Sequence, residues 1–87
     1  FKEMKKLKIL NLSFNKIASL KNIVFSDNSH LEEVYFQNNQ IELINGDLLK
    51  SAKNLKKLDL SNNNLYELDS HLFENLEELT YLNLSNN

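Results

Sequence analysis

The sequence predicts a solenoid, a fold in which each repeat of the chain forms one coil that stacks on the next. Three observations lead to this prediction. A leucine-rich pattern starts at Leu7, Leu31, Leu55 and Leu79, always 24 positions after the last start, and it always ends on asparagine. A second set of apolar residues recurs in phase with it. Repeat periods of about 20 to 50 residues are the signature of solenoids and related arrays.

The first half of each repeat predicts a short strand. It reads L-x-x-[LV]-x-[LF]-x-x-N, as "LKILNLSFN", "LEEVYFQNN", "LKKLDLSNN" and "LTYLNLSNN". Leu58 and Leu60 alternate with polar residues, as the residues of a half-buried strand do. Leu55 and Leu65 fall outside that alternation and outside a helical stripe, so no isolated element explains the spacing of the leucines.

The second half of each repeat also carries apolar residues in register. The four aligned sets are Leu20, Ile44 and Leu68; Val24, Leu48 and Leu72; Phe1, Phe25, Leu49 and Phe73; and Met4, Asn28, Ala52 and Leu76. In the last set Asn28 is polar and Ala52 is small, so we expect weaker packing of the outer side at these two positions.

This pattern resembles the leucine-rich repeat (LRR) family over the whole chain. The 24-residue unit with Phe25 and Phe73 in its second half is similar to the "typical" subclass, which includes Toll-like receptor type ectodomains and small secreted proteoglycans. The resemblance implies an α/β solenoid, a right-handed coil with a parallel β-sheet on its concave face and turns, 3-10 or short helices on its convex face. The leucines expected to point inward in one repeat are Leu55, Leu58, Leu60, Leu65 and Leu68.

The register divides the chain into one domain, residues 1–87. It holds a partial repeat 1–6, the repeats 7–30, 31–54 and 55–78, and a partial repeat 79–87. Solenoids need a terminal unit with a polar outer face, and neither end of this sequence has a cap of the kind that extracellular members of the family carry. We therefore expect the chain to be a fragment of a longer solenoid.

The asparagine that closes each strand segment is expected to have a structural role. Where the chain bends inward after the strand, backbone N–H and C=O groups are buried away from any strand neighbour. A side-chain amide is both donor and acceptor, so it can satisfy them within its own turn and toward the next repeat. This predicted asparagine ladder consists of Asn15, Asn39, Asn63 and Asn87.

Composition excludes several classes of function. The net charge is −2 and the chain has no arginine, so nucleic acid is not an expected partner. There is no cysteine for a disulfide or thiolate site, and a single glycine, Gly46, cannot build a phosphate-binding loop. No apolar run approaches the roughly 20 residues of a membrane span, so no membrane contact is expected from this segment.

The resemblance implies that residues between the strand leucines meet a protein or other macromolecular ligand on the concave face. The candidates are Ile9, Glu33, Tyr35, Lys57, Asp59 and Tyr81. Exposed tyrosines commonly anchor interfaces, which makes Tyr35 and Tyr81 the leading ones. Phe14 lies where an aromatic residue shields the turn in this family, so a structural role is expected for it.

Charges alternate in sign across the predicted strands. Lys8, Glu32 and Lys56 occupy one row, and Glu33 and Lys57 are neighbours in the next. We expect these charges to pair within the sheet, each pair contributing about 0.2 to 1 kcal/mol. A charged contact surface is the alternative.

Two N-glycosylation sequons, both "NLS", begin at Asn11 and Asn83. Each arises whenever asparagine fills the variable slot of "L-x-L-S". A glycan at Asn11 or Asn83 would lie on the concave face and move ligand binding to the flank or the convex side.

No catalytic, cofactor or metal site is predicted. His30 and His71 fall in the outer halves of different repeats and are interpreted as solvated loop histidines. Glu32, Glu33 and Asp59 have no metal-ligand spacing with them. No serine accompanies a plausible base and oxyanion donors.

The leading hypothesis is a non-catalytic recognition module, part of an extracellular or cell-surface LRR receptor or a secreted LRR protein. A role in innate-immune signalling and a receptor dimer partner in the full-length protein follow from the resemblance to Toll-like receptors. The alternatives are a cytoplasmic scaffold or effector, a repeat spacer that sets curvature, and an enzyme whose catalytic part lies elsewhere.

Overall fold

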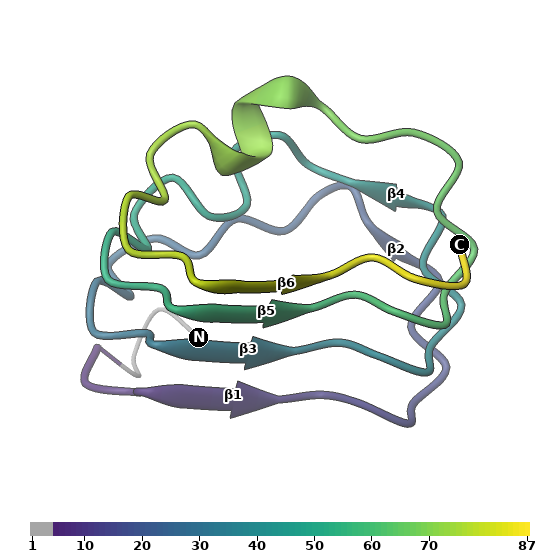
Figure 1. The fold of residues 1–87 in the computed structure, drawn as a ribbon, viewed down its shortest axis with the longest axis horizontal. Helices are drawn as coiled ribbons and strands as arrows, with labels where there is room; N and C mark the ends of the chain where they lie inside the picture. Colours follow the sequence, from purple (N-terminus) through teal and green to yellow (C-terminus); the bar gives the residue numbers. More distant parts are fainter. Residues whose placement is uncertain (1–4) are drawn as a thin grey trace.

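The computed structural model describes residues 5–87. Phe1 and Met4, which the repeat register aligns with other apolar residues, lie outside the described residues, and so does most of the partial repeat 1–6. The strands are β1 (Ile9–Asn11), β2 (Ser19–Leu20), β3 (Glu33–Tyr35), β4 (Leu43–Ile44), β5 (Lys57–Asp59) and β6 (Tyr81–Asn83), and a 3-10 helix η1 (Ser70–Phe73) precedes β6 (Figure 1).

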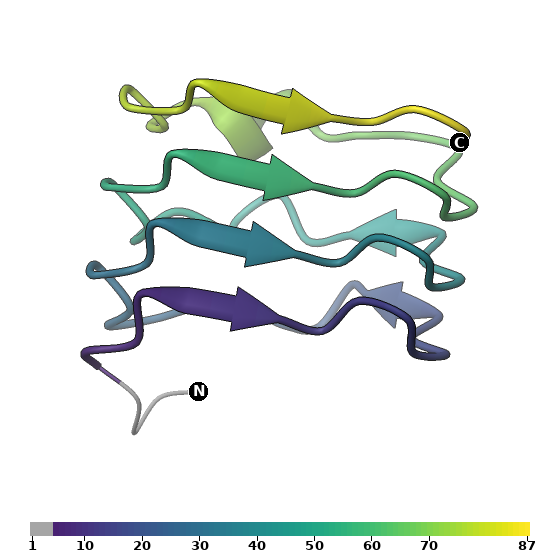
Figure 2. The ribbon, with the colours of Figure 1, turned by 60° about the horizontal axis from the view of Figure 1, so that its bottom comes forward.

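Two parallel sheets form opposite sides of the molecule. The four-stranded sheet has the order β1-β3-β5-β6, and β2 pairs with β4 in the second sheet. Ile9 is opposite Glu33, Glu33 opposite Lys57, and Lys57 opposite Tyr81, so neighbouring strands occupy equivalent places in successive repeats. Figure 2 shows the four long strands in front and the short ones behind. The predicted solenoid with a parallel sheet is confirmed.

The core lies between the two sheets. The central residue of each of the first three long strands, Leu10, Val34 and Leu58, is buried. The ring of Phe25, from the outer half of the first repeat, stacks on Phe36 of the second repeat, with ring centroids 6.3 Å apart. Each fully buried side chain of this size contributes about 1.5 to 3 kcal/mol, and stacking of the repeats is what buries them.

The inward-pointing leucines of the third repeat are only partly as expected. Leu55, Leu58 and Leu60 are buried, and Leu65 is partly buried against the core. Leu68, however, is 37% exposed. Its equivalent Leu20 is buried, and the next repeat pairs with it through β4. No later repeat covers Leu68 in the described residues, which explains the difference.

The expectation of weak packing at Asn28 and Ala52 is wrong, because both residues are buried. The main chain forms the same turn at both places. The N–H of Leu31 donates to the Asn28 carbonyl oxygen at 3.2 Å, and the N–H of Leu55 donates to that of Ala52 at 3.2 Å. The N–H of Leu79 makes the same bond to the Leu76 carbonyl oxygen, and Leu76 is buried too, so this turn places polar, small and large side chains alike against the core.

The outer half of the third repeat carries η1, and no α-helix occurs in residues 5–87. Asp69 caps η1, since its side chain accepts a hydrogen bond from the N–H of His71. Within the described part of the chain no helix is both long enough and apolar enough to cross a bilayer.

Candidate ligand-binding surface

The outward side of the four-stranded sheet, here called the strand face, carries two rows of side chains in register. The first row is Ile9, Glu33, Lys57 and Tyr81, and the second is Asn11, Tyr35, Asp59 and Asn83. These rows contain all six candidate binding residues and both candidate glycosylation sites. Neighbouring strands are about 4.8 Å apart, so the eight side chains form one continuous surface.

The first row exposes apolar surface at both ends. Ile9 is 53% exposed and Tyr81 is 45% exposed. Between them lie the carboxylate of Glu33 and the ammonium group of Lys57. An exposed aromatic or aliphatic side chain beside charged groups is the composition of a protein-binding surface.

Glu33 is paired within its own strand. The hydroxyl of Tyr35 donates a hydrogen bond to Glu33 Oε1. This bond and the nearby negative charge raise the pKa of Tyr35, because ionisation would break the bond and place two anions side by side. The expected pair of Glu33 with Lys57 does not form, so that prediction is wrong.

The charge alternation one position earlier is only partly realised. Lys56 Nζ lies 3.4 Å from Glu32 Oε1 in a solvent-exposed ion pair, as expected. Lys8 has no carboxylate within 4.0 Å among residues 5–87. The cause is competition, since Glu32 meets Lys56 on one side and leaves Lys8 on the other side unpaired.

The second row builds a recurring turn. Asn11 Oδ1 accepts the N–H of Ser13 at 3.0 Å, Asp59 Oδ1 that of Ser61 at 2.9 Å, and Asn83 Oδ1 that of Ser85 at 3.0 Å. The serine hydroxyl donates to the same oxygen in each case. Asp59 makes this turn without being a sequon. The turn alone therefore accounts for the "NLS" pattern at Asn11 and Asn83, and their glycosylation stays a prediction.

The asparagines at the ninth position of each repeat link successive coils. Asn63 Nδ2 donates to the carbonyl oxygens of Leu60, Ser61 and Phe36, and its Oδ1 accepts the N–H of Ile41 at 3.0 Å. Asn39 makes the same contacts one repeat earlier, and Asn87 one repeat later. The links to another coil therefore run to the preceding repeat and not, as expected, to the next one.

The ends of this ladder are less buried than its middle. Asn39 and Asn63 are buried, whereas Asn15 and Asn87 are exposed. Asn15 bonds only within its own turn, to the carbonyl oxygens of Leu12 and Ser13. A buried amide with four partners stabilises the coil more than an exposed one, since losing it strands polar groups out of reach of water.

Comparison with known proteins agrees with this geometry. A family model described as "Leucine rich repeat" matches residues 5–65 and residues 29–87, which together span almost the whole chain. The chain belongs to the leucine-rich repeat family. No curated protein matches the chain.

LRR domains commonly bind proteins, and this LRR chain is a repeat module of that type. LRR units are typically non-catalytic, and within residues 5–87 no three histidine or acidic side chains gather in a group that could hold a metal ion.

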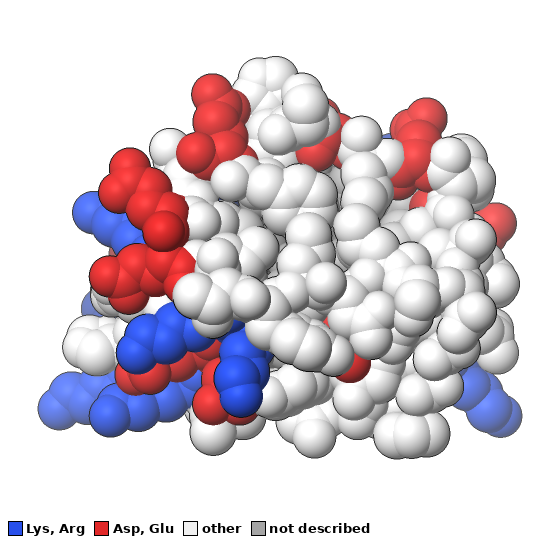
Figure 3. Space-filling model, in the orientation of Figure 1, with Lys and Arg blue, Asp and Glu red and all other residues white. Residues whose placement is uncertain are grey.

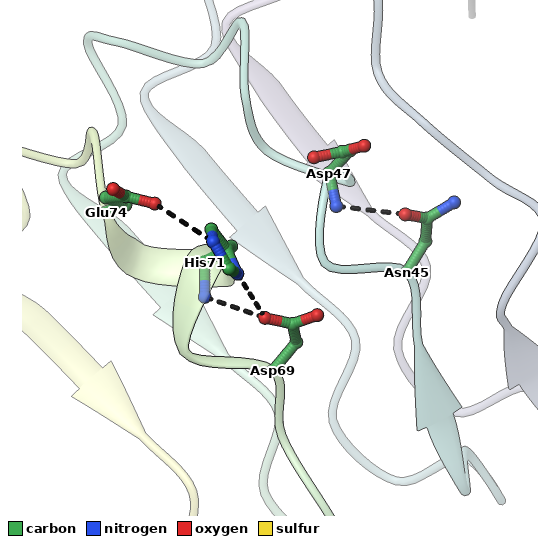
Figure 4. A network of polar contacts seen from close by, with 5 residues as sticks. All are labelled: Asn45, Asp47, Asp69, His71 and Glu74. Atoms are coloured by element: carbon green, nitrogen blue, oxygen red, sulfur yellow. Dashed lines mark hydrogen bonds and ion pairs between the residues drawn. The ribbon is translucent and has the colours of Figure 1, made fainter.

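Both histidines lie away from the strand face and are exposed. His30 Nδ1 lies 3.1 Å from the carbonyl oxygen of Lys5 in the preceding repeat. His71 sits at η1, with Nδ1 2.8 Å from Asp69 Oδ1 and Nε2 3.9 Å from Glu74 Oε2 (Figure 4). The hydrogen bond to Asp69 is the main cause of a raised His71 pKa.

Asp69 also explains the single glycine of the chain. A Cβ atom on Gly46 would lie 2.6 Å from Asp69 Oδ2. Because that contact is shorter than van der Waals distance, Gly46 lets the Asp69 carboxylate of the third repeat approach the backbone of the second. The hydrogen bond from the His71 N–H lowers the Asp69 pKa.

Sequence reasoning missed one row of residues next to the ladder. Phe14, Asn38, Asn62 and Asn86 all have a positive φ, between 56° and 61°. Asparagine tolerates this left-handed conformation better than other residues with a Cβ atom, so three asparagines at equivalent positions were the available signal. Phe14 does not shield its turn as expected, because its side chain is 77% exposed.

Proposed function

We propose that this LRR segment recognises a protein through the first row of the strand face. The observation that carries the proposal is the register of the first row. It places one exposed apolar side chain at each end, Ile9 and Tyr81, and two charged residues, Glu33 and Lys57, between them. A few anchor side chains, often aromatic, dominate the affinity of many protein interfaces, and Tyr81 is the exposed aromatic residue of this row.

A photo-crosslinking comparison tests this proposal. A benzophenone amino acid replaces either Tyr81 on the strand face or Tyr66, which is also exposed but lies outside the four-stranded sheet. In cells that express the protein, the proposal predicts a covalent adduct of one defined higher mass when the benzophenone is at position 81. The same adduct should be absent when the benzophenone is at position 66. Equal products from both positions would mean that the strand face has no special role.

We further propose that the segment belongs to an extracellular or cell-surface LRR protein of the typical subclass, similar to Toll-like receptors in innate immunity. The resemblance of the 24-residue repeat to that subclass supports this. In such a parent a second receptor subunit is the natural signalling partner. The alternative is an intracellular LRR scaffold or effector.

Secretion from animal cells behind a heterologous signal peptide separates these locations. An extracellular protein should be secreted, and enzymatic removal of N-linked glycans should lower its mass at Asn11 or Asn83. Asp59→Asn is the matched control, because it introduces a sequon in the same turn geometry. A chain that is retained inside the cell would contradict the extracellular proposal and favour the alternative.

A glycan at Asn11 would crowd Tyr35, and a glycan at Asn83 would crowd Asp59, the adjacent members of the second row. The first row lies two residues earlier in each strand, toward the side where the strands begin. Protein recognition by a glycosylated chain would therefore use the first row and the surface beside it.

A further inference from the structure

Six lysines gather on the side of the molecule where the long strands begin. Figure 3 shows blue side chains at the lower left of this view, interspersed with red acidic ones. We call this surface the lysine flank, and its lysines are Lys5, Lys6, Lys8, Lys53, Lys56 and Lys57, all exposed.

The lysine flank has a net positive charge in an acidic protein. Two carboxylates, Glu32 and Glu33, lie among its six lysines, which leaves four positive charges. Because the whole chain has a net charge of −2, the remainder carries six net negative charges. The flank is therefore the part of the surface that attracts anionic groups.

Both carboxylates of the flank already have partners. Glu32 forms the ion pair with Lys56, and Glu33 accepts the hydroxyl of Tyr35. The other five lysines have no carboxylate within 4.0 Å in the described part of the chain. Among residues 5–87, a ligand can therefore reach these ammonium groups without breaking an ion pair.

The backbone holds these lysines at fixed intervals. The Lys8 carbonyl oxygen accepts the N–H of Glu32 at 2.8 Å, and the Glu32 carbonyl oxygen accepts that of Lys56 at 2.8 Å. Two strand spacings, about 10 Å, therefore separate the backbone of Lys8 from that of Lys56 and of its neighbour Lys57 at the start of β5. His30 and Asn54 fix the adjoining loops through contacts to the carbonyl oxygens of Lys5 and Ser29.

The flank ends before β6, where the equivalent loop positions at the end of the repeat 55–78 carry Glu77 and Glu78. An open groove of about 340 Å³ marks this boundary. It is lined by Lys50, Lys53, Asn54, Asn75, Glu77 and Glu78. No Lys–Glu ion pair forms across it within 4.0 Å among residues 5–87. The two glutamates repel an anionic ligand, so the attractive surface is limited to the first three repeats.

We propose that the lysine flank binds an acidic segment of a protein, with carboxylates about 10 Å apart that meet Lys8 on the first repeat and Lys57 on the third. This inference rests on the proposed protein recognition and names the chemistry of the partner. Discrete carboxylates can reach the unpaired lysines and avoid Glu32 and Glu33. A uniform polyanion would meet those glutamates, and the chain has no arginine for bidentate phosphate binding.

The test uses a synthetic peptide of four Glu-Pro-Pro units. A polyproline II helix has three residues per turn and rises about 3.1 Å per residue, so successive carboxylates lie on one face, about 9 Å apart. The matched control peptide has glutamine in place of each glutamate. Titration of the chain at low ionic strength, followed by calorimetry, should show binding of the glutamate peptide only. Added salt should weaken that binding, because exposed charges are screened beyond about 8 Å at physiological ionic strength.

Two double variants locate the binding site. Lys8→Glu with Lys57→Glu should weaken binding of the glutamate peptide about tenfold or more, because two attractive contacts become repulsive. Lys16→Glu with Lys21→Glu makes the same charge change at exposed lysines outside the flank and should have little effect. Equal weakening by both variants would overturn the proposal, since overall charge would then explain binding.

A sulfated heparin oligosaccharide is the competitor probe. If it binds more tightly than the glutamate peptide and depends on the same two lysines, the flank is a polyanion site and the acidic-protein proposal fails. If no peptide binds while the Tyr81 crosslink persists, the lysine-flank inference fails and the proposed protein recognition stands. If neither peptide binding nor the Tyr81 crosslink is observed, both the lysine-flank inference and the proposed protein recognition fail.

Discussion

At the scale of single residues, the eighth position of each repeat shows how a phenylalanine side chain adds backbone strain to a turn that usually carries asparagine. Asn38, Asn62 and Asn86 adopt a left-handed backbone that asparagine accepts readily, whereas Phe14 adopts it with φ 57° and an exposed ring. The turn around them is the same, because each neighbouring repeat provides a carbonyl oxygen to the N–H of Phe14, Asn38 and Asn62. Phe14 is thus the strained member of the row.

Replacing Phe14 by asparagine should stabilise the chain by about 1 kcal/mol, since asparagine relieves the left-handed strain and little buried ring surface is lost. Urea unfolding measures this as a higher midpoint. Asn62→Phe, the reverse change in an equivalent turn, is the control and should lower the midpoint. A lower midpoint for Phe14→Asn would show that contacts of the ring outweigh the strain.

Asn63→Leu should destabilise the chain far more than Asn62→Leu. Asn63 is buried and satisfies three carbonyl oxygens and the N–H of Ile41, and each stranded group costs about 1 to 3 kcal/mol. Asn62→Leu adds left-handed strain of about 1 to 2 kcal/mol. Equal unfolding midpoints for the two variants would rule out the ladder as a main source of stability.

At the scale of elements, η1 is held by polar contacts at its start. Asp69 accepts the N–H of His71 at 2.9 Å and contacts the His71 ring, while Gly46 lets the carboxylate lie against the preceding repeat (Figure 4). Capping of this kind satisfies an N–H that a short helix leaves free. The His71 ring then adds a contact that depends on its protonation.

Stability should fall as pH rises through the folded-state pKa of His71. That pKa is raised above the ordinary value of 6.5, first by the hydrogen bond to Asp69 and then by the charges of Asp69 and Glu74. The stabilisation is therefore complete below the unfolded-state pKa and is lost above the folded one. Comparing urea midpoints of the chain and of His71→Gln at about pH 5.5 and pH 8.5 should show a difference only at the lower pH.

The Asp69 carboxylate works in the opposite direction. Its pKa is lowered from the ordinary 3.8 chiefly by the backbone hydrogen bond from His71. Its contribution is present above the unfolded-state pKa and is lost as pH falls through the folded one. A pH-independent difference between the chain and His71→Gln would contradict the role assigned to the ring.

At the scale of the whole molecule, stability comes from stacking of repeats. Each coil contacts only its neighbours, so a leucine covered on both sides is worth more than its equivalent with one open side. Leu58 and Leu82 are equivalent residues of β5 and β6, yet Leu58 is buried and Leu82 is exposed. Equal sequence positions therefore have unequal energetic weight.

Leu58→Ala should destabilise the chain by about 2 to 5 kcal/mol, the usual cost of a leucine-sized cavity in a core. Leu82→Ala should cost much less, because water already reaches that side chain. Urea unfolding followed by circular dichroism compares the two. Similar losses of stability would indicate that Leu82 is covered in solution by a contact outside residues 5–87.

Much of the fold could be predicted from the sequence, because every 24 residues the same pattern of apolar and asparagine positions recurs and forms the same coil. The solenoid and the register of its buried positions follow from that period, and the parallel sheet follows from the resemblance to the LRR family. Leu68, Asn28 and Ala52 were predicted wrongly, since burial depends on what covers a residue in the neighbouring coil. Glu33 and Lys57 were expected to form an ion pair, but the carboxylate of Glu33 instead accepts a hydrogen bond from the hydroxyl of Tyr35 in the same strand.

The sequence by itself determined the solenoid, its register and the rows of residues that share a face, because these follow from periodicity alone. Only the tertiary structure decided which members of a row interact. It showed that Glu33 binds Tyr35, that Lys8 and Lys57 have no carboxylate within 4.0 Å among residues 5–87, and that lysines of successive repeats form one flank. The physical reason is that each polar side chain has several possible partners within reach. Which contact forms depends on distances between repeats, and these cannot be read from the sequence of one repeat.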